Sequence, residues 1–337
     1  MMHTVAVLGA GAWGTALAKT LSDKGHQVRL WSWQKAHADA IEGQRENADF
    51  LPGATLGSTL RATSDLHDAL RGADMVLTAV PTHVLREVLG NAAPHLPREV
   101  PILSVSKGIE ISTLKVVSGI FEDCVSAEAL RCVAYLGGPS FAKEVAAGMP
   151  TAVVIACERQ EVAQKWQDAL STDRLRAYTT DDVIGIELGG ALKNVIAIAA
   201  GMSDGLGFGH NSRAALITRG LAEMTRLATK MGAHPLTLAG LGGMGDLVLT
   251  CTGDLSRNRT VGLELGKGRK LPDVLAGMTQ VAEGVRTTKA AHELAKREGC
   301  EMPITDAMYR ILYEEQPPVE AVVELMTRRK RAERDDD

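Results

Sequence analysis

A chain of 337 residues, with 45% hydrophobic and 23% charged side chains, has the composition of a globular protein with room for two domains. Its net charge of −4 excludes a nucleic-acid partner recruited by bulk electrostatics. The five cysteines form no C-x-x-C pair, which argues against a disulfide framework and for a reducing, cytoplasmic setting.

The first predicted element is an apolar strand at residues 5–8 that breaks at Gly9. Gly9, Gly11 and Gly14 have the spacing G-x-G-x-x-G, and helix-forming residues resume at once. In such a motif the first glycine makes a tight turn, the second lets the backbone approach a pyrophosphate, and the third lets helix and strand pack closely. We therefore predict a dinucleotide site here, with no signal peptide ahead of it. The alternative is a purely structural turn.

The end of the next strand, at 27–31, bears on the choice of cofactor. Enzymes strict for NAD usually carry Asp or Glu about twenty residues beyond the glycines, where it binds the ribose 2′-hydroxyl. Residues 31–35 read Trp-Ser-Trp-Gln-Lys, with no acid before Asp39, and Lys35 could reach a 2′-phosphate. We predict that NADP or NAD is accepted and that NADPH is preferred.

Short apolar runs alternate with helical segments through the first half, which predicts a parallel, doubly wound α/β sheet. The further strands are expected at 60–63, 75–80, 101–106, 133–136 and 151–156, with Thr82 capping the helix after Pro81. Ligands bind at the carboxyl ends of such strands, which points to Lys107 and to 138–140. The alternative for Lys107 is a solvated loop residue.

From about residue 181 the pattern changes to helix after helix, which predicts an all-helical second domain. We place the boundary between a dinucleotide-binding Rossmann domain at 1–182 and a helical domain at 183–337. The first of these helices is apolar enough for a membrane, but Glu187 and Lys193 would be costly at a bilayer centre, so we predict a buried helix and no membrane partner.

On that helix Gly189, Gly190 and Lys193 share a face. Glycines inside a helix cost stability, so we expect these two to admit another backbone or a ligand beside Lys193. An ammonium in apolar surroundings has a lowered pKa, as a proton-transfer group requires. The alternative is a lysine whose stem reaches along the surface to water.

Three later stretches complete the candidate site. Asp246, between glycines and an apolar run, needs a cationic or hydroxyl partner, for which Lys193 is the candidate; Thr250 lies one helical turn on. Ser256, Arg257 and Asn258 at a helix start suit a phosphate, or else a capped surface helix. Glu283, in a helix beginning at 280–284, could simply complement the helix dipole.

Other features of the second half point away from additional ligands. No histidines have metal-ligand spacing such as H-x-x-x-H, so we predict no bound metal. The stretch at 205–211 is expected to be a flexible loop before a helix that Asn211 or Ser212 could cap. The mixed charges at 328–337 predict a solvated, frayed end and not a nucleic-acid tail.

Six segments together carry a family likeness: GAGAWGTALA at 9–18, VSKGI at 105–109, GPSFAKE at 138–144, ELGGALKNVIAIAAG at 187–201, GDLVLTCT at 245–252 and SRNR at 256–259. Their order and spacing along nearly the whole chain closely resemble bacterial NAD(P)-dependent glycerol-3-phosphate dehydrogenase. The resemblance implies interconversion of dihydroxyacetone phosphate and sn-glycerol 3-phosphate for phospholipid synthesis, by a cytoplasmic homodimer with its site between a Rossmann domain and a helical domain.

The resemblance also implies roles for single residues. Lys193 is similar to the family's catalytic acid–base. The positions similar to substrate-binding ones are Lys107, Gly138, Ser140, Lys193, Asp246, Ser256, Arg257 and Asn258. Those similar to cofactor-binding ones are Gly9, Gly11, Ala12, Trp13, Gly14, Trp33, Lys107, Ala142, Arg257, Val281 and Glu283. Trp33 departs from the polar residue expected at its position, which bears on cofactor preference.

Two other functions remain open at this point. One is a dehydrogenase of the 6-phosphogluconate or 3-hydroxyacid type, which also pairs a Rossmann domain with helices and uses a helix-borne Lys-Asn pair. Turnover on a panel of phosphorylated and carboxylated substrates would separate these enzymes, and Ser256–Asn258 favours a phosphorylated substrate. The other is a non-catalytic redox sensor that binds NAD(P), against which Lys107, Lys193 and Asp246 argue.

Overall fold

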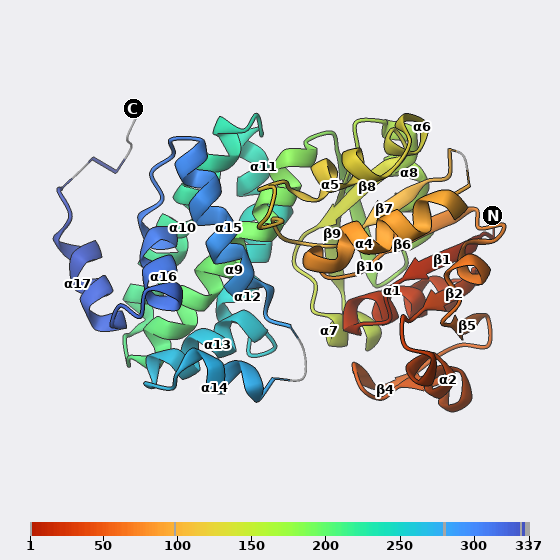
Figure 1. Ribbon diagram of the computed structural model, residues 1–337, viewed down its shortest axis with the longest axis horizontal. Coiled ribbons are helices and arrows are strands. Elements are labelled where there is room, and N and C mark those ends of the chain that lie inside the picture. Colours follow the sequence, from red (N-terminus) through yellow and green to blue (C-terminus); the bar gives the residue numbers. More distant parts are fainter. Residues whose placement is uncertain (1, 98, 279–280, 331, 334–337) are drawn as a thin grey trace.

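The computed structural model describes residues 2–97, 99–278, 281–330 and 332–333. Figure 1 shows two bodies side by side, a sheet covered by helices that contains the N-terminus and a bundle of helices that contains the C-terminus. The Rossmann-like α/β arrangement followed by helices is the fold that the alternation of apolar runs predicted.

The first body is built on one sheet with the strand order β10-β9-β8-β7-β6-β1-β2-β5. Its strands are β1 (Thr4–Leu8), β2 (Gln27–Trp31), β5 (Leu60–Thr63), β6 (Met75–Thr78), β7 (Ile102–Ser104), β8 (Val133–Gly137), β9 (Thr151–Ala156) and β10 (Leu175–Thr180). All neighbours pair in parallel except β8 and β9, which are antiparallel, so the prediction of a wholly parallel sheet is wrong at that pair. The sequence analysis also missed β10 and a small hairpin of β3 (Glu46–Asn47) and β4 (Leu51–Thr55).

Helices cover both faces of this sheet, and alternate side chains of the central strand β1 are therefore buried on opposite sides. Val5 and Val7 pack into one core with α1 (Ala12–Asp23), α2 (Lys35–Gln44) and α8 (Gln160–Leu170). Ala6 and Leu8 pack into a second core with α3 (Leu66–Leu70), α4 (Thr82–Ala92), α5 (Val117–Cys124) and α6 (Ala127–Leu130). This two-sided burial is what makes strands of a parallel sheet read as continuous apolar runs.

The second body is organised around α9 (Val183–Gly205), of which residues 185–203 are all buried. The helices around it are α10 (His210–Lys230), α11 (Pro235–Ala239), η2 (Leu241–Gly245), α12 (Asp246–Thr252), α13 (Arg257–Gly266), α14 (Leu271–Ala276), α15 (Glu283–Arg297), α16 (Pro303–Tyr313) and α17 (Pro318–Thr327). By length and composition α9 could cross a membrane, but 89% of its most apolar window is buried inside the protein, as expected of a core helix.

Two predicted helix caps are wrong. Helix α4 begins at Thr82 itself, with Pro81 in the N-cap position and no side-chain cap among the described residues. The Thr82 N–H donates to Glu283 Oε1 of the second body at 3.2 Å. Helix α10 begins at His210 after Gly209, so neither Asn211 nor Ser212 caps it.

Two other predictions fall partly outside the described residues. The helix expected at 280–284 begins at Glu283, and Gln280 lies outside the part of the chain that the structure describes. The predicted frayed end at 328–337 also lies partly outside it.

Candidate functional site

The glycine turn between β1 and α1 has the geometry that its spacing predicted. Gly9 has a φ of +115°, and a Cβ there would lie 2.6 Å from the Ala79 carbonyl oxygen. A Cβ on Gly14 would lie 2.0 Å from the Gly9 carbonyl oxygen, so only glycine lets helix and strand pack this closely. Within the part of the chain that the structure describes, a Cβ on Gly11 would meet nothing within 4 Å, and no side chain caps α1. Open space beside uncapped N–H groups fits the phosphates of a dinucleotide.

A chain of hydrogen bonds ties the end of β2 to this turn. Ser32 Oγ lies 2.8 Å from His37 Nδ1, His37 Nε2 lies 3.0 Å from Asn47 Oδ1, and Asn47 Nδ2 donates to the Ala10 carbonyl oxygen and to Thr15 Oγ1, both at 2.8 Å. Sequence reasoning missed Asn47 and His37, since no motif marks residues that act on a backbone 37 positions away.

The side chains considered for the 2′ position of the cofactor lie on the surface. Trp33 is 75% exposed, and Lys35 forms an exposed ion pair with Asp39 at 2.8 Å. Trp13, in the first turn of α1, has an indole N–H that is buried without an acceptor among the described residues. Cofactor preference stays a prediction.

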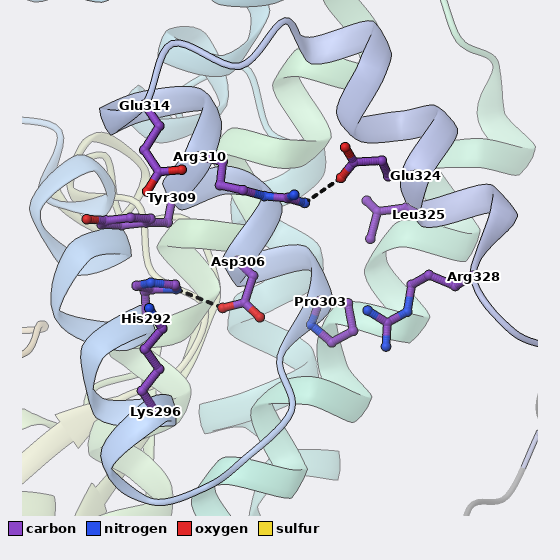
Figure 2. A pocket seen from close by; sticks show the side chains of 10 residues that line it. All are labelled: His292, Lys296, Pro303, Asp306, Tyr309, Arg310, Glu314, Glu324, Leu325 and Arg328. Carbon is purple, nitrogen blue, oxygen red and sulfur yellow. Dashed lines mark hydrogen bonds and ion pairs between the residues drawn. The ribbon is translucent and has the colours of Figure 1, made fainter.

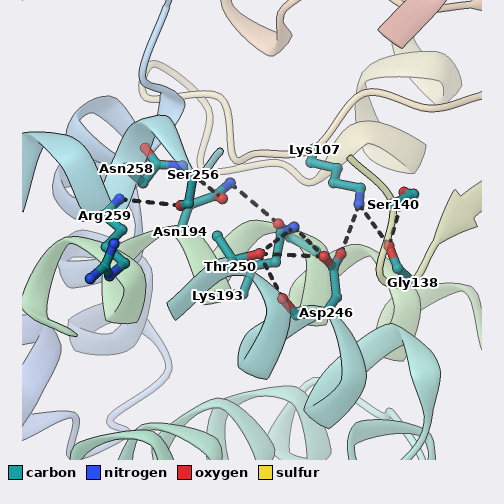
Figure 3. Close-up of polar contacts among 11 residues, drawn as sticks. Lys107, Gly138, Ser140, Lys193, Asn194, Asp246, Thr250, Ser256, Asn258 and Arg259 are labelled. Carbon is teal, nitrogen blue, oxygen red and sulfur yellow. Dashed lines mark hydrogen bonds and ion pairs between the residues drawn. The ribbon is translucent and has the colours of Figure 1, made fainter. Parts of the chain in front are cut away.

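Two lysines and one aspartate meet where the two bodies join (Figure 3). Lys193, on α9, forms an ion pair with Asp246 Oδ1 and donates to Thr250 Oγ1 at 3.0 Å. Lys107, from the loop after β7, donates to Asp246 Oδ2 at 2.7 Å. The Asp246 side chain is 1% exposed, so the carboxylate is shared between two ammonium groups away from water. The predicted pairing of Lys193 with Asp246, with Thr250 one turn on, is present.

The charges of this cluster shift one another's protonation. Burial lowers the pKa of Lys193 to about 8, and the Asp246 carboxylate works in the opposite direction, while the charge of Lys107 lowers it further. Burial acts to raise the pKa of Asp246, but the charges of Lys107 and Lys193 outweigh it and hold that pKa below its ordinary value. Asp246 is therefore ionised, and Lys193 can change its proton occupancy near neutral pH.

Gly189 and Gly190 make room for this cluster on α9. A Cβ on Gly189 would lie 2.4 Å from the Gly242 carbonyl oxygen of η2, and one on Gly190 would lie 3.4 Å from the Lys107 side chain. The prediction that these glycines admit a neighbour is confirmed, with a backbone at the first and the Lys107 stem at the second.

The loop after β8 reaches the same place. Gly138 has a φ of +105°, Ser140 Oγ donates to its carbonyl oxygen at 3.1 Å, and Lys107 Nζ lies 3.5 Å from that oxygen. Ala142 begins α7 (Ala142–Ala146), which packs against α1 and so brings this loop toward the glycine turn.

The stretch at 256–258 forms the predicted helix start. Ser256 caps α13 by accepting the Arg259 N–H at 3.2 Å. Asn258 is buried, where Nδ2 donates to Asn194 Oδ1 and Oδ1 accepts the Gly284 N–H, both at 2.9 Å. Arg257 is exposed and donates to the Val281 carbonyl oxygen at 2.8 Å. Of these three side chains, the structure leaves Arg257 the most available to a ligand.

Val281 and Glu283 lie where α15 begins. Val281 is 43% exposed. Burial raises the pKa of Glu283 to about 7, against the effect of the Thr82 N–H and of the charges of Arg257, Lys107 and Lys193. Glu283, in the second body, thus accepts a hydrogen bond from Thr82 in the first. The interpretation of Glu283 as a complement to the helix dipole did not predict this contact.

A cavity of about 270 Å³ lies at this junction, with Thr82, Lys107 and Glu283 in its wall. A larger one of about 460 Å³ lies between α15, α16 and α17 (Figure 2) and shares no residue with the Lys193 cluster. Two pairs of side chains meet across its walls, His292 with Asp306 and Arg310 with Glu324, each at 2.7 Å. Among the described residues, no group of three or more His, Cys, Asp or Glu side chains is placed to hold a metal ion.

Family models match both bodies. The model described as NAD-dependent glycerol-3-phosphate dehydrogenase N-terminus matches residues 4–163, and the one described as its C-terminus matches 182–323. Curated relatives bear the name glycerol-3-phosphate dehydrogenase, with the cofactor given as NAD(P)+. One from Geobacter sp. (strain M21) is 56% identical over 333 residues, 99% of each chain, and one from Myxococcus xanthus is 55% identical over 327 residues, 97% of this chain and 98% of that one.

Solved structures agree with these matches. The crystal structure of glycerol-3-phosphate dehydrogenase from Coxiella burnetii superposes with a TM-score of 0.93 at 41% identity, covering 97% of this chain and 99% of that one. The enzyme of the same name from Saccharomyces cerevisiae gives a TM-score of 0.78 at 26% identity, over 95% and 98% of the two chains. The chain therefore belongs to the NAD-dependent glycerol-3-phosphate dehydrogenase family.

Proposed function

We propose that this protein is an oxidoreductase that interconverts dihydroxyacetone phosphate and sn-glycerol 3-phosphate with NAD(P)H. The observation that carries the proposal is the buried cluster of Lys193, Asp246 and Lys107, in a chain whose curated relatives bear the name of that enzyme. Its main direction would be toward glycerol 3-phosphate, as the backbone of phospholipids.

The proposed organisation is a dinucleotide-binding domain at 1–182 and a helical catalytic domain at 183–337. The last strand of the sheet ends at Thr180 and α9 begins at Val183, which supports this boundary. We propose a cytoplasmic homodimer on the strength of the family resemblance, and the molar mass in solution tests the dimer.

The cofactor would be held along the carboxyl ends of the strands. Gly9, Gly11, Gly14 and the first turn of α1, with Ala12 and Trp13, would hold its phosphates, supported by the open space at Gly11. The remaining proposed contacts are Trp33, Lys107, Ala142, Arg257, Val281 and Glu283. When bound, the nicotinamide supplies a hydride for the C2 carbonyl carbon of the substrate.

The protein's own groups would then handle the proton and the charge. Lys193 Nζ donates a proton to the carbonyl oxygen as the alkoxide develops, and the ammonium of Lys107 stabilises that negative charge. Asp246 keeps both lysines in place and favours the protonated form of Lys193. In glycerol phosphate oxidation the same lysine, now neutral, accepts the hydroxyl proton.

The rest of the proposed substrate site orients the molecule. Arg257 would bind the phosphate, with Asn258 and Ser256 shaping its site, and binding energy at that remote group would align the carbonyl with Lys193. Gly138 and Ser140 would border the substrate on the side of Lys107, supported by the proximity of Lys107 Nζ to the Gly138 carbonyl oxygen.

The pH dependence of the two directions is expected to be opposite. Reduction needs protonated Lys193, whose pKa is lowered to about 8, so kcat for dihydroxyacetone phosphate reduction should fall as pH rises through about 8. Oxidation needs the neutral form, so its kcat should rise through the same range and level off above it. Initial rates in both directions between pH 6.5 and 9.5 measure this, and parallel profiles would contradict the acid–base role.

A direct assay tests the function. The protein is mixed with dihydroxyacetone phosphate and either NADPH or NADH, and absorbance of the reduced nicotinamide is followed; we expect turnover with both and a higher kcat/KM with NADPH. Preference for 6-phosphogluconate or a 3-hydroxyacid in parallel reactions would favour the related dehydrogenases. Cofactor binding without turnover on any substrate would favour a redox sensor.

A further inference from the structure

Three positions on helix α9 contact the residues that connect the two bodies. Glu187, Gly190 and Lys193 are spaced three residues apart, so each is a neighbour of the next on the surface of the helix. Lys193 meets Asp246, and the stem of Lys107 lies against Gly190. The proposed function uses Lys193 and Lys107 and leaves Glu187 unassigned.

Glu187 holds the first turn of α5. Its Oε1 accepts the Ser118 N–H and its Oε2 accepts the Ser118 hydroxyl, both at 2.6 Å, and its residue is 8% exposed. Burial raises the pKa of Glu187 to about 7, against the effect of these two bonds, and no cation among the described residues partners it. An apolar side chain could fill this position without that desolvation cost, so packing alone does not account for a carboxyl group here.

Ser118 is connected to Lys107 through a braced loop. An isolated antiparallel bridge joins Ile109 to Val116 and closes the loop between them. Inside it the Glu110 N–H donates to the Lys115 carbonyl oxygen at 2.9 Å, and the Glu110 carboxylate accepts two bonds from Arg86, at 2.7 and 2.9 Å. Lys107 and Ser118 therefore flank a segment that is held together by these contacts.

The contacts form a closed circuit, from α9 through Glu187, Ser118, the loop, Lys107 and Asp246 back to Lys193 on the same helix. We propose that Glu187 is a positioning residue for the reaction, which, by holding Ser118 against α9, sets Lys107 at the distance from Lys193 at which both ammonium groups share Asp246. This inference rests on the proposed function, since it assigns Glu187 to the placement of a group that acts there.

A double-mutant cycle on turnover tests the circuit. Glu187→Leu should lower kcat about tenfold, since a small misplacement of a reacting group has effects of this size or larger, with cofactor Kd unchanged. In a Lys107→Met background, Glu187→Leu should alter kcat by less than about twofold. The ammonium of Lys107, which Glu187→Leu misplaces, is already absent there. Multiplicative effects of the two changes would mean a merely structural role and overturn the inference, as would full activity of Glu187→Leu.

The matched control is Glu187→Gln, whose amide can accept the Ser118 N–H and donate to the hydroxyl. It should keep kcat within about twofold of the unchanged protein, as the retained hydrogen bonds require. If Glu187→Leu fails to fold, judged by circular dichroism and thermal unfolding, Ser118→Ala takes its place in the cycle, with an expected loss of about threefold for one of the two bonds. Activity unaffected by both Lys107→Met and Lys193→Met would instead remove the proposed function itself.

Discussion

Replacing Lys193 with methionine is expected to lower turnover by at least ~10²-fold while leaving cofactor affinity nearly unchanged. Methionine has nearly the length of lysine but neither proton nor charge. The structural disturbance should be small, because Asp246 keeps the ammonium of Lys107 at 2.7 Å as a counter-charge. Single-turnover rates of dihydroxyacetone phosphate reduction and the dissociation constant of NADPH, from quenching of protein fluorescence, measure the two effects separately.

Lys193→Arg distinguishes proton transfer from the effect of positive charge at residue 193. A guanidinium keeps the positive charge beside Asp246 but does not release its proton near neutral pH. If proton transfer is the function of residue 193, the arginine variant should be nearly as slow as the methionine variant. If charge alone matters, arginine should recover most of the turnover. A methionine variant within threefold of the unchanged protein would remove Lys193 from the mechanism.

Local sequence rules predicted those parts of the site whose neighbours are close in the chain. The roles of Gly9 and Gly14 follow from the spacing of a strand, a turn and a helix, and the structure has both contacts. The face of α9 that carries Gly189, Gly190 and Lys193 follows from helical periodicity in the same way. Even the pairing of Lys193 with Asp246, 53 residues on, could be inferred because a buried carboxylate needs a partner.

The missed features are of two kinds. β10 (Leu175–Thr180) is partly exposed and alternates buried with exposed residues over its first four positions, so a search for continuous apolar runs passed over a signal that was present. The contacts of Glu283 with Thr82 and of Glu187 with Ser118 join residues 201 and 69 positions apart. No local pattern specifies such pairs, since they depend on how the two bodies dock.

Asp246→Asn is expected to lower the free energy of unfolding and to change the pH dependence of the reduction rate. Asparagine has the shape of aspartate but leaves Lys107 and Lys193 facing each other without a counter-charge in a buried cluster. Breaking a buried ion pair by removing one partner costs about 3–5 kcal/mol. Because Asp246 raises the pKa of Lys193, its loss should lower that pKa further below about 8, so the reduction rate should begin to fall at a lower pH.

The sign of the pH dependence makes this prediction specific. The destabilisation by Asp246→Asn arises from repulsion between the charged Lys107 and Lys193. It should therefore shrink as pH rises and Lys193 loses its proton. Urea unfolding at pH 7 and pH 9 should therefore show that the variant loses less free energy of unfolding at the higher pH. Asp39→Asn is the matched control, because it breaks a Lys–Asp pair of similar length on the surface, with Lys35, and should cost no more than about 1 kcal/mol. Two results would contradict the prediction that one buried carboxylate holds two lysines together. One is an equal loss of unfolding free energy in Asp246→Asn and Asp39→Asn, and the other is a loss in Asp246→Asn that grows with pH.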